Sequence, residues 1–233
     1  MSQPNALKSA CRMTRGELIF GWIYIPFYLI GIAWLLVAGA ELLHRELSDS
    51  VLNLIYCYIN FFAIAIGFRR FLGESLKRLQ VLQLLKNLLL AFGVFYLCSL
   101  LLSLLVSLLP EYTNPADATT TELIHGERNQ MSVCAIFLAP LVEEILVRGL
   151  IFAPLARKNR LLGYAVSVLA FSALHLWGYV GSVKVPVLLL AMLDYVPGGV
   201  ALAFSYERSG NIWAPIALHM LINALSVWAI TLI

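Results

Sequence analysis

Charged residues are scarce in this sequence. Only 12% of its 233 residues are Asp, Glu, Lys or Arg, while 61% are hydrophobic, and the mean hydropathy is +0.86. An average soluble domain is about 25% charged and about 45–50% apolar. The composition therefore excludes an ordinary soluble domain, because an apolar excess of this size requires contact with lipid.

The basic residues are too few and too scattered to form a nucleic-acid surface. The formal net charge is only +3, and the Lys and Arg residues flank apolar runs. Such a placement is typical of residues that set membrane topology. We therefore expect membrane lipid as a partner and no nucleic acid.

The usual cysteine and zinc patterns are also missing. Cys11, Cys57, Cys98 and Cys134 form no CxxC pair, and the last three lie inside apolar runs. This placement indicates small buried hydrophobic side chains and neither a disulfide framework nor a cysteine-bound metal. The HExxH spacing of many zinc hydrolases is absent too.

Long hydrophobic runs dominate what is present. A spanning helix needs about 20 mainly apolar residues. The first run is too long for the core of a cleaved signal peptide, which is about 7–15 residues, so we interpret it as the first anchor. The sequence predicts an all-α polytopic transmembrane helical bundle of seven spans, or eight if a long run is split. The predicted spans are Leu18–Ala40, Val51–Phe68, Leu84–Leu109, Met131–Leu155, Leu161–Val180, Val185–Tyr206 and Ile212–Ile233.

Basic residues gather in alternate loops. The basic loops precede the first span, join the second to the third, and join the fourth to the fifth. Cytoplasmic loops collect Lys and Arg, so we expect a cytoplasmic N-terminus, in a membrane that we interpret as a prokaryotic inner (plasma) membrane. The residues are Lys8, Arg12, Arg15, Arg69, Arg70, Lys77, Arg78, Lys86, Arg157, Lys158 and Arg160.

A polar stretch over 111–130 divides the chain and is predicted to be a loop. Residues 1–110 form a three-span region with almost no ionisable groups inside its spans. Residues 131–226 form a core of four spans that contains most of the polar residues at membrane depth. We therefore expect any functional site in the second part.

Ionisable groups inside the spans need an explanation. Each charge costs at least ~2.5–3.5 kcal/mol on insertion scales and usually faces a cavity. Glu144 and Arg148 are i,i+4 neighbours that favour an ion pair, whereas Glu143 lies about 100° round the helix and stays free for a cavity. Alternatively, both glutamates share Arg148 as a packing contact. The residues to explain are Glu143, Glu144, Arg148, His175, Asp194, His219 and Asn223.

The histidines are ambiguous when taken one at a time. A lone histidine on an apolar helix is more often satisfied by an interhelical hydrogen bond. However, Glu143, His175, His219 and Asn223 are predicted to have similar depths at about 1.5 Å per residue, which favours one shared pocket. Asp194 either lines that pocket or pairs with a neighbouring helix, and the sequence leaves both open.

Three segments together resemble a known family. The segment Glu143–Gly149, preceded by Ala139-Pro140, resembles the EExxxR motif of the CPBP intramembrane proteases, also called Abi or type II CAAX prenyl endopeptidases. Phe171–His175 is similar to their FxxxH motif, and His219–Asn223 to their HxxxN motif. The resemblance covers roughly 131–226, and Val147 departs from it where the family usually has Phe.

The resemblance implies an intramembrane endopeptidase that uses no cofactor. It implies that Glu143 and His175 activate a water, that His219 and Asn223 stabilise the oxyanion, and that Glu144 with Arg148 supports the site. The expected substrate is a membrane-associated protein or peptide, possibly a C-terminal tail.

Three alternatives remain open. One is a zinc-dependent version of the protease, for which two histidines and a glutamate are suitable ligands, although our preferred mechanism has no metal. Another is a non-catalytic membrane assembly or immunity factor with the same fold. The third is a proton-coupled transporter, against which the lack of repeated broken-helix halves weighs.

Overall fold

The computed structural model describes residues 6–108, 114–126 and 128–232. Helices account for nearly all regular structure in these ranges, and no strand occurs in them. The elements are α1 (Ala6–Ser9), α2 (Arg15–Pro26), η1 (Phe27–Gly31), α3 (Ile32–Leu42), α4 (Asp49–Gly67), α5 (Arg69–Lys77), α6 (Val81–Val106), α7 (Pro115–Gly126), α8 (Arg128–Val133), η2 (Cys134–Leu138), α9 (Ala139–Glu144), η3 (Ile145–Phe152), α10 (Ala153–Ala156), α11 (Arg160–Leu176), η4 (Trp177–Tyr179), α12 (Val185–Asp194), α13 (Val196–Ser209) and α14 (Trp213–Ile230).

Five helices are long and apolar enough to cross a membrane, or six if the bent pair α12–α13 is one span. The predicted all-α polytopic bundle is therefore confirmed, with fewer spans by length and composition than the predicted seven. The difference is the predicted fourth span. It is helical over 128–156 but contains Glu143, Glu144 and Arg148, and it is not among the five.

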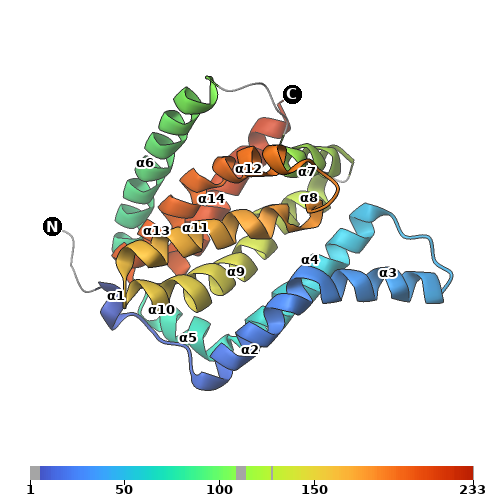
Figure 1. Ribbon diagram of the computed structural model, residues 1–233. Helices are drawn as coiled ribbons and strands as arrows, with labels where there is room; N and C mark the ends of the chain where they lie inside the picture. Colours follow the sequence, from blue (N-terminus) through green and yellow to red (C-terminus); the bar gives the residue numbers. More distant parts are fainter. Residues whose placement is uncertain (1–5, 109–113, 127, 233) are drawn as a thin grey trace.

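This charged helical segment lies at the centre of the bundle. From Pro140 to Leu150 every residue is buried. Helices α11 and α14 pack on it, α13 packs on both of them, and α2 and α4 contact it from the other side. Figure 1 shows α3 and the first part of α4 projecting away from this bundle. The apolar runs therefore surround the polar helix, as expected where lipid replaces water outside.

Proline explains why the central helix changes its hydrogen-bonding pattern. In the π-helix η2 the N–H of Ala139 donates to Cys134, five residues earlier. The next donor in that pattern is Pro140, which has no N–H, so the carbonyl of Ala135 loses its backbone partner. The side-chain amide of Asn223 donates to this carbonyl at 2.7 Å. A second Ala-Pro pair, at 153–154, follows the π-helix η3 in the same way.

The predicted sixth span is broken. Helices α12 and α13 meet at Tyr195 with a bend of 41°. Pro197 lies in the first turn of α13, where a missing N–H does no harm. Gly199 follows, and a side chain there would lie 3.3 Å from the Cα of Val168, so its small size lets α13 approach α11 closely.

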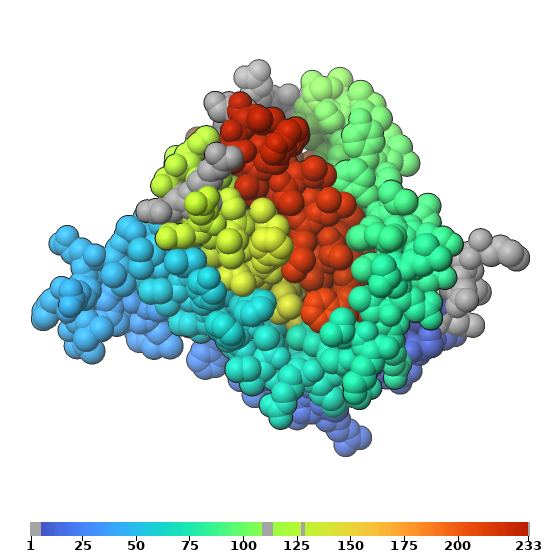
Figure 2. All heavy atoms as spheres, turned by 180° about the vertical axis from the view of Figure 1, so that it is seen from behind, coloured from blue at the N-terminus to red at the C-terminus, as the bar shows by residue number. Residues whose placement is uncertain are grey.

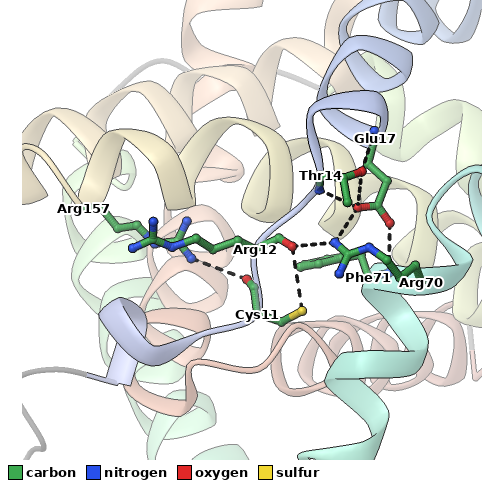
Figure 3. A network of polar contacts seen from close by, with 7 residues as sticks. All are labelled: Cys11, Arg12, Thr14, Glu17, Arg70, Phe71 and Arg157. Carbon is green, nitrogen blue, oxygen red and sulfur yellow. Dashed lines mark hydrogen bonds and ion pairs between the residues drawn. The ribbon is translucent and has the colours of Figure 1, made fainter.

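The predicted cytoplasmic loops meet at one end of the molecule, which we call the basic end. The Arg157 guanidinium donates to the carbonyls of Leu7 and Cys11, at 3.2 and 3.5 Å. Arg70 donates to the carbonyl of Arg12 and forms a 2.8 Å ion pair with Glu17 (Figure 3). The segment before α2 is thereby bound to α5 and to the end of α10.

The predicted polar loop over 111–130 is partly helical. Helix α7 begins at Pro115, and the side chain of Asn114 accepts a hydrogen bond from the N–H of Ala116 at 3.1 Å. Asn followed by Pro is a helix-start pattern, because Asn satisfies a free N–H and Pro lacks one. The remaining predicted loop residues 111–113 and 127 lie outside the described residues.

Candidate active site

Three ionisable side chains from three helices converge inside the bundle. Glu143 lies on α9, His175 on α11 and His219 on α14. The Oε2 atom of Glu143 is 3.6 Å from His175 Nε2 and 3.8 Å from His219 Nε2. One ligand atom of each residue lies within 4.8 Å of the others. The structure therefore brings these three predicted site residues together.

A hydrogen bond to the backbone fixes which nitrogen of His175 faces the centre of the site. The Nδ1 atom lies 2.9 Å from the carbonyl of Phe171, one helical turn earlier. A carbonyl only accepts, so Nδ1 carries the proton, and Nε2 of the neutral ring presents a lone pair towards Glu143. The FxxxH spacing thus has a backbone role as well as a packing role.

His219 is oriented in the same way by a carboxylate. Its Nδ1 atom lies 2.9 Å from Glu144 Oε1, which also accepts from Arg148 at 3.0 Å. Because the carboxylate is an acceptor when ionised, Nδ1 carries the proton and Nε2 is directed towards Glu143. Both histidines are therefore held by their Nδ1 atoms and offer Nε2 to the same point.

The two glutamates differ in their ion pairing, as the helical spacing predicts. Glu144 and Arg148 form a fully buried i,i+4 ion pair, and Glu143 makes no ion pair with Arg148. Sharing of Arg148 by both glutamates is therefore wrong. The guanidinium also donates to the carbonyl of Gly199 at 3.3 Å and lies 4.4 Å above the Phe171 ring. Arg148 thus links α9, α11 and α13 around the site.

Glu143 keeps an unused acceptor. Its Oε2 atom is buried and has no hydrogen-bond partner among the residues that the structure describes. Its side chain is 11% exposed and that of His175 is 24% exposed, so the site is not sealed from outside. A free carboxylate oxygen beside two imidazole lone pairs is suited to binding a proton, a water or a cation.

Aromatic rings form one wall of the site, and sequence reasoning missed one of them. The ring of Tyr195 lies 4.4 Å from that of His175 at an angle of 30°, and Phe171 contacts both histidines at 4.6 and 5.4 Å. Tyr195 lies at the break between α12 and α13. The available signal was its position beside Asp194 and before the proline that breaks the helix.

Asn223 lies one turn after His219 on α14, as predicted, and one of its amide hydrogens is used in the bond to Ala135. Its second amide N–H is not needed for that bond. The Asn223 side chain thus supports the π-helical turn that precedes Glu143.

Asp194 is contacted by the residue that precedes α7. Asn114 donates to its carboxylate at 2.9 Å. This bond shows that Asp194 pairs with a neighbouring segment, the residue before α7. Helix α7 is thereby attached next to Tyr195, at the edge of the site.

The charges around the site sum to −1 when both histidines are neutral, because Glu143 and Glu144 oppose Arg148 alone. A proton on one histidine or a bound cation would offset this charge. The donor set fits zinc, since His nitrogen and carboxylate oxygen are its common ligands. Ligands about 2.0–2.1 Å from a tetrahedral ion lie about 3.4 Å apart, close to the observed separations from Glu143 Oε2. Partners at both Nδ1 atoms are typical of metal-binding histidines.

Comparison with known proteins gives one match. Residues 129–225 match the family model described as type II CAAX prenyl endopeptidase Rce1-like. No curated protein and no solved structure matches the chain. The matched segment begins in α8 and ends in α14, so it includes Glu143, His175 and His219. The resemblance drawn from the three motifs is thereby confirmed, and the similarity to this family extends over residues 129–225, less than half of the chain.

Proposed function

We propose that this membrane protein is an endopeptidase that hydrolyses a peptide bond of a membrane-associated protein or peptide. The observation that supports this proposal most is the convergence of Glu143, His175 and His219 on one point inside the bundle. The Rce1-like match adds a protease family to that geometry. By the same match, the first substrate class to test is a prenylated C-terminal CAAX peptide.

In the proposed mechanism, Glu143 and His175 together activate a water. The free Oε2 atom accepts a proton from the water, and the Nε2 lone pair of His175 accepts a hydrogen bond from the same water or takes its proton. The proton then passes to the leaving amine. Such general acid–base catalysis contributes typically about 10²–10⁴-fold.

The developing oxyanion requires hydrogen-bond donors. We propose His219 and Asn223 for this role, four residues apart on α14. His219 would donate through Nε2 when it also carries a proton there, and this atom lies 3.8 Å from Glu143 Oε2. Asn223 would use its second amide N–H, because the first is bonded to Ala135.

A metal-dependent version of the same reaction is the second candidate, and the orientation of the two histidines favours it. Glu143, His175 and His219 would be the ligands. A bound divalent ion would act as a Lewis acid that lowers the pKa of a water. Glu144 would then orient His219, and the Phe171 carbonyl would orient His175.

The test of catalysis uses two Glu→Gln changes in purified protein. Glu143→Gln removes the proposed base, whereas Glu41→Gln removes an exposed carboxylate at the end of α3. With a farnesylated CAAX peptide we expect a loss of at least about 100-fold for Glu143→Gln and none for Glu41→Gln. If the peptide is not cut, comparison of C-terminal peptides from cells with either variant identifies the substrate. Equal processing in both strains would favour the non-catalytic assembly factor.

Metal dependence has its own readout. Elemental analysis of protein purified without chelator measures bound zinc per chain. The metal-dependent version predicts about one ion per wild-type chain and a loss in His175→Ala, with Lys158→Ala as the control. Cleavage that persists after chelator treatment in protein with no bound metal would contradict it.

A further inference from the structure

A polar cavity lies at the basic end, and none of the catalytic candidates lines it. It has a volume of about 710 Å³ and is formed between the start of α6, the end of α13 and the beginning of α14. Three basic side chains line it, Arg78, Lys86 and Arg208, and no acidic residue does. The lining of the cavity therefore has a net positive charge.

None of the three cations has a counterion among the residues that the structure describes. Neither Lys86 nor Arg208 makes an ion pair within 6–108, 114–126 and 128–232, and Arg78 donates only a long hydrogen bond, 3.3 Å, to the carbonyl of Ser9. The start of α6 adds to the positive electrostatic potential of the cavity. Its N-cap residue Gln80 makes no side-chain capping bond, so the partial positive charge of a long helix remains at the cavity.

A buried polar atom also points to an absent partner. Asn87 lines the cavity and is only 3% exposed. Its amide nitrogen donates to the carbonyl of Ser205 at 2.8 Å, but its Oδ1 atom has no hydrogen-bond partner in the described structure. An acceptor of this kind fits a hydroxyl or another donor on the ligand, next to cations that fit a phosphate.

Part of the cavity lining is apolar and exposed. Leu89 and Leu90 line it between the second and third turns of α6, and their exposed fractions are 77% and 48%. Figure 2 shows α6 along the edge of the rear face, beside α14. A ligand with a phosphate at the basic end and an alkyl chain along α6 would contact both parts. A soluble phosphate would contact only the first.

We propose that this cavity binds the phosphate of an anionic phospholipid whose head group carries a hydroxyl donor, as in phosphatidylglycerol. The phosphate contacts Lys86, Arg208 and Arg78, the head-group hydroxyl donates to Asn87, and an acyl chain follows Leu89 and Leu90. Basic pockets between transmembrane helices are suited to such head groups. The bound lipid joins α6 to α13, which carries the Gly199 carbonyl that holds Arg148.

The test uses the full chain in detergent and two double variants that each remove two cations. Lys86→Ala with Arg208→Ala changes the cavity, whereas Lys77→Ala with Lys158→Ala removes the same charge from exposed positions at the same end. Native mass spectrometry and the shift in Tm measure binding of phosphatidylglycerol, phosphatidylcholine and inorganic phosphate. Each cation removed should weaken binding about fivefold. The cavity variant, which lacks two, should therefore bind phosphatidylglycerol about 30-fold more weakly, and the control variant should bind it like the wild type.

Each outcome decides the matter. Selective binding of phosphatidylglycerol that only the cavity variant loses supports the proposal, and Asn87→Leu should reduce the preference for phosphatidylglycerol over a diester lipid without a head-group hydroxyl. Equal losses in both double variants would overturn it, because general surface charge would then explain binding. Stabilisation by inorganic phosphate alone, lost in the cavity variant, would overturn the lipid and assign a soluble phosphate.

Discussion

Two helices of this molecule contain π-helical turns next to a proline, yet their surroundings are opposite. The first covers Arg15–Leu42, and only 11% of its most apolar window is buried. The second covers 128–156 and is buried at every position from Pro140 to Leu150, although it contains Glu143, Glu144 and Arg148. The more polar of the two helices is therefore the one in the interior.

The difference teaches how apolarity relates to burial in this chain. Lipid is as apolar as a leucine side chain, so an exposed apolar helix loses nothing by facing it. Charged side chains gain from the interior because only there do they find partners such as His219 and the Gly199 carbonyl. Specific contacts, rather than apolarity, therefore place the central helix.

The largest expected effect comes from breaking the buried ion pair. Arg148→Met leaves Glu144 buried without its guanidinium, and we expect a loss of about 3–5 kcal/mol in the free energy of unfolding. Glu41→Gln, at an exposed position of the first helix, should change it by less than about 0.5 kcal/mol. Denaturant titration in mixed micelles measures both. Similar small changes in the two variants would mean that the ion pair does not anchor the central helix.

The same contrast applies to leucine. Leu146 is 1% exposed in the central helix and Leu35 is 55% exposed in the first helix. We expect Leu146→Ala to cost about 2–5 kcal/mol, because a cavity forms, and Leu35→Ala to cost less than about 0.5 kcal/mol. The same titration compares them. A large loss for Leu35→Ala would indicate that this face packs against another protein rather than lipid.

A smaller effect tests why the central helix has its π-helical turn. Asn223→Ala leaves the Ala135 carbonyl without a donor and should cost about 1–3 kcal/mol. Pro140→Ala restores a backbone N–H, so the cost of Asn223→Ala should shrink in that background.

Pro26→Ala is the matched change in the exposed helix, where it should not alter the effect of Asn223→Ala. Additive losses for Pro140→Ala and Asn223→Ala would contradict the explanation of the turn. Their coupling is measured by a double-mutant cycle on the free energy of unfolding.

The smallest effect concerns α7, which lies outside the spans. Burial and the neighbouring Asp194 raise the pKa of Asp117 above its usual value. A carboxyl with a raised pKa in the folded state favours the protonated form there, so docking of α7 should strengthen as the pH falls through that pKa. Although its carboxyl is partly desolvated, Asp117 remains accessible to solvent, which keeps the effect small. Hydrogen exchange of α7 between pH 8 and 5 should show this trend, and Asp117→Asn should remove it.

Part of this arrangement follows from the sequence alone. The Glu144–Arg148 pair and the free Glu143 were both predicted, because each depends on helical spacing. The break between α12 and α13 was not, because Val185–Tyr206 was expected to be one span. The meeting of three helices was suggested by similar depths and motif order. Local periodicity therefore predicts which residues share one face of a helix.

Other contacts depend on which helices become neighbours and were not predictable. Tyr195 beside His175 requires the bend between α12 and α13, and Asn223 on Ala135 requires α14 to pack on η2. Glu17 was missed for a different reason. With Thr14 it forms a capping box whose spacing was visible, but its partners Arg70 and Phe71 come from α5.

The attachment of the first segment to the basic end also constrains the order of assembly. Leu7 receives its hydrogen bond from Arg157, and Gly210 lies so close to Ala6 that a side chain there would collide with its carbonyl. Both contacts join residues that are at least 150 positions apart in the sequence. These contacts can therefore form only after α13 has been synthesised, so this end cannot close before α13 is present.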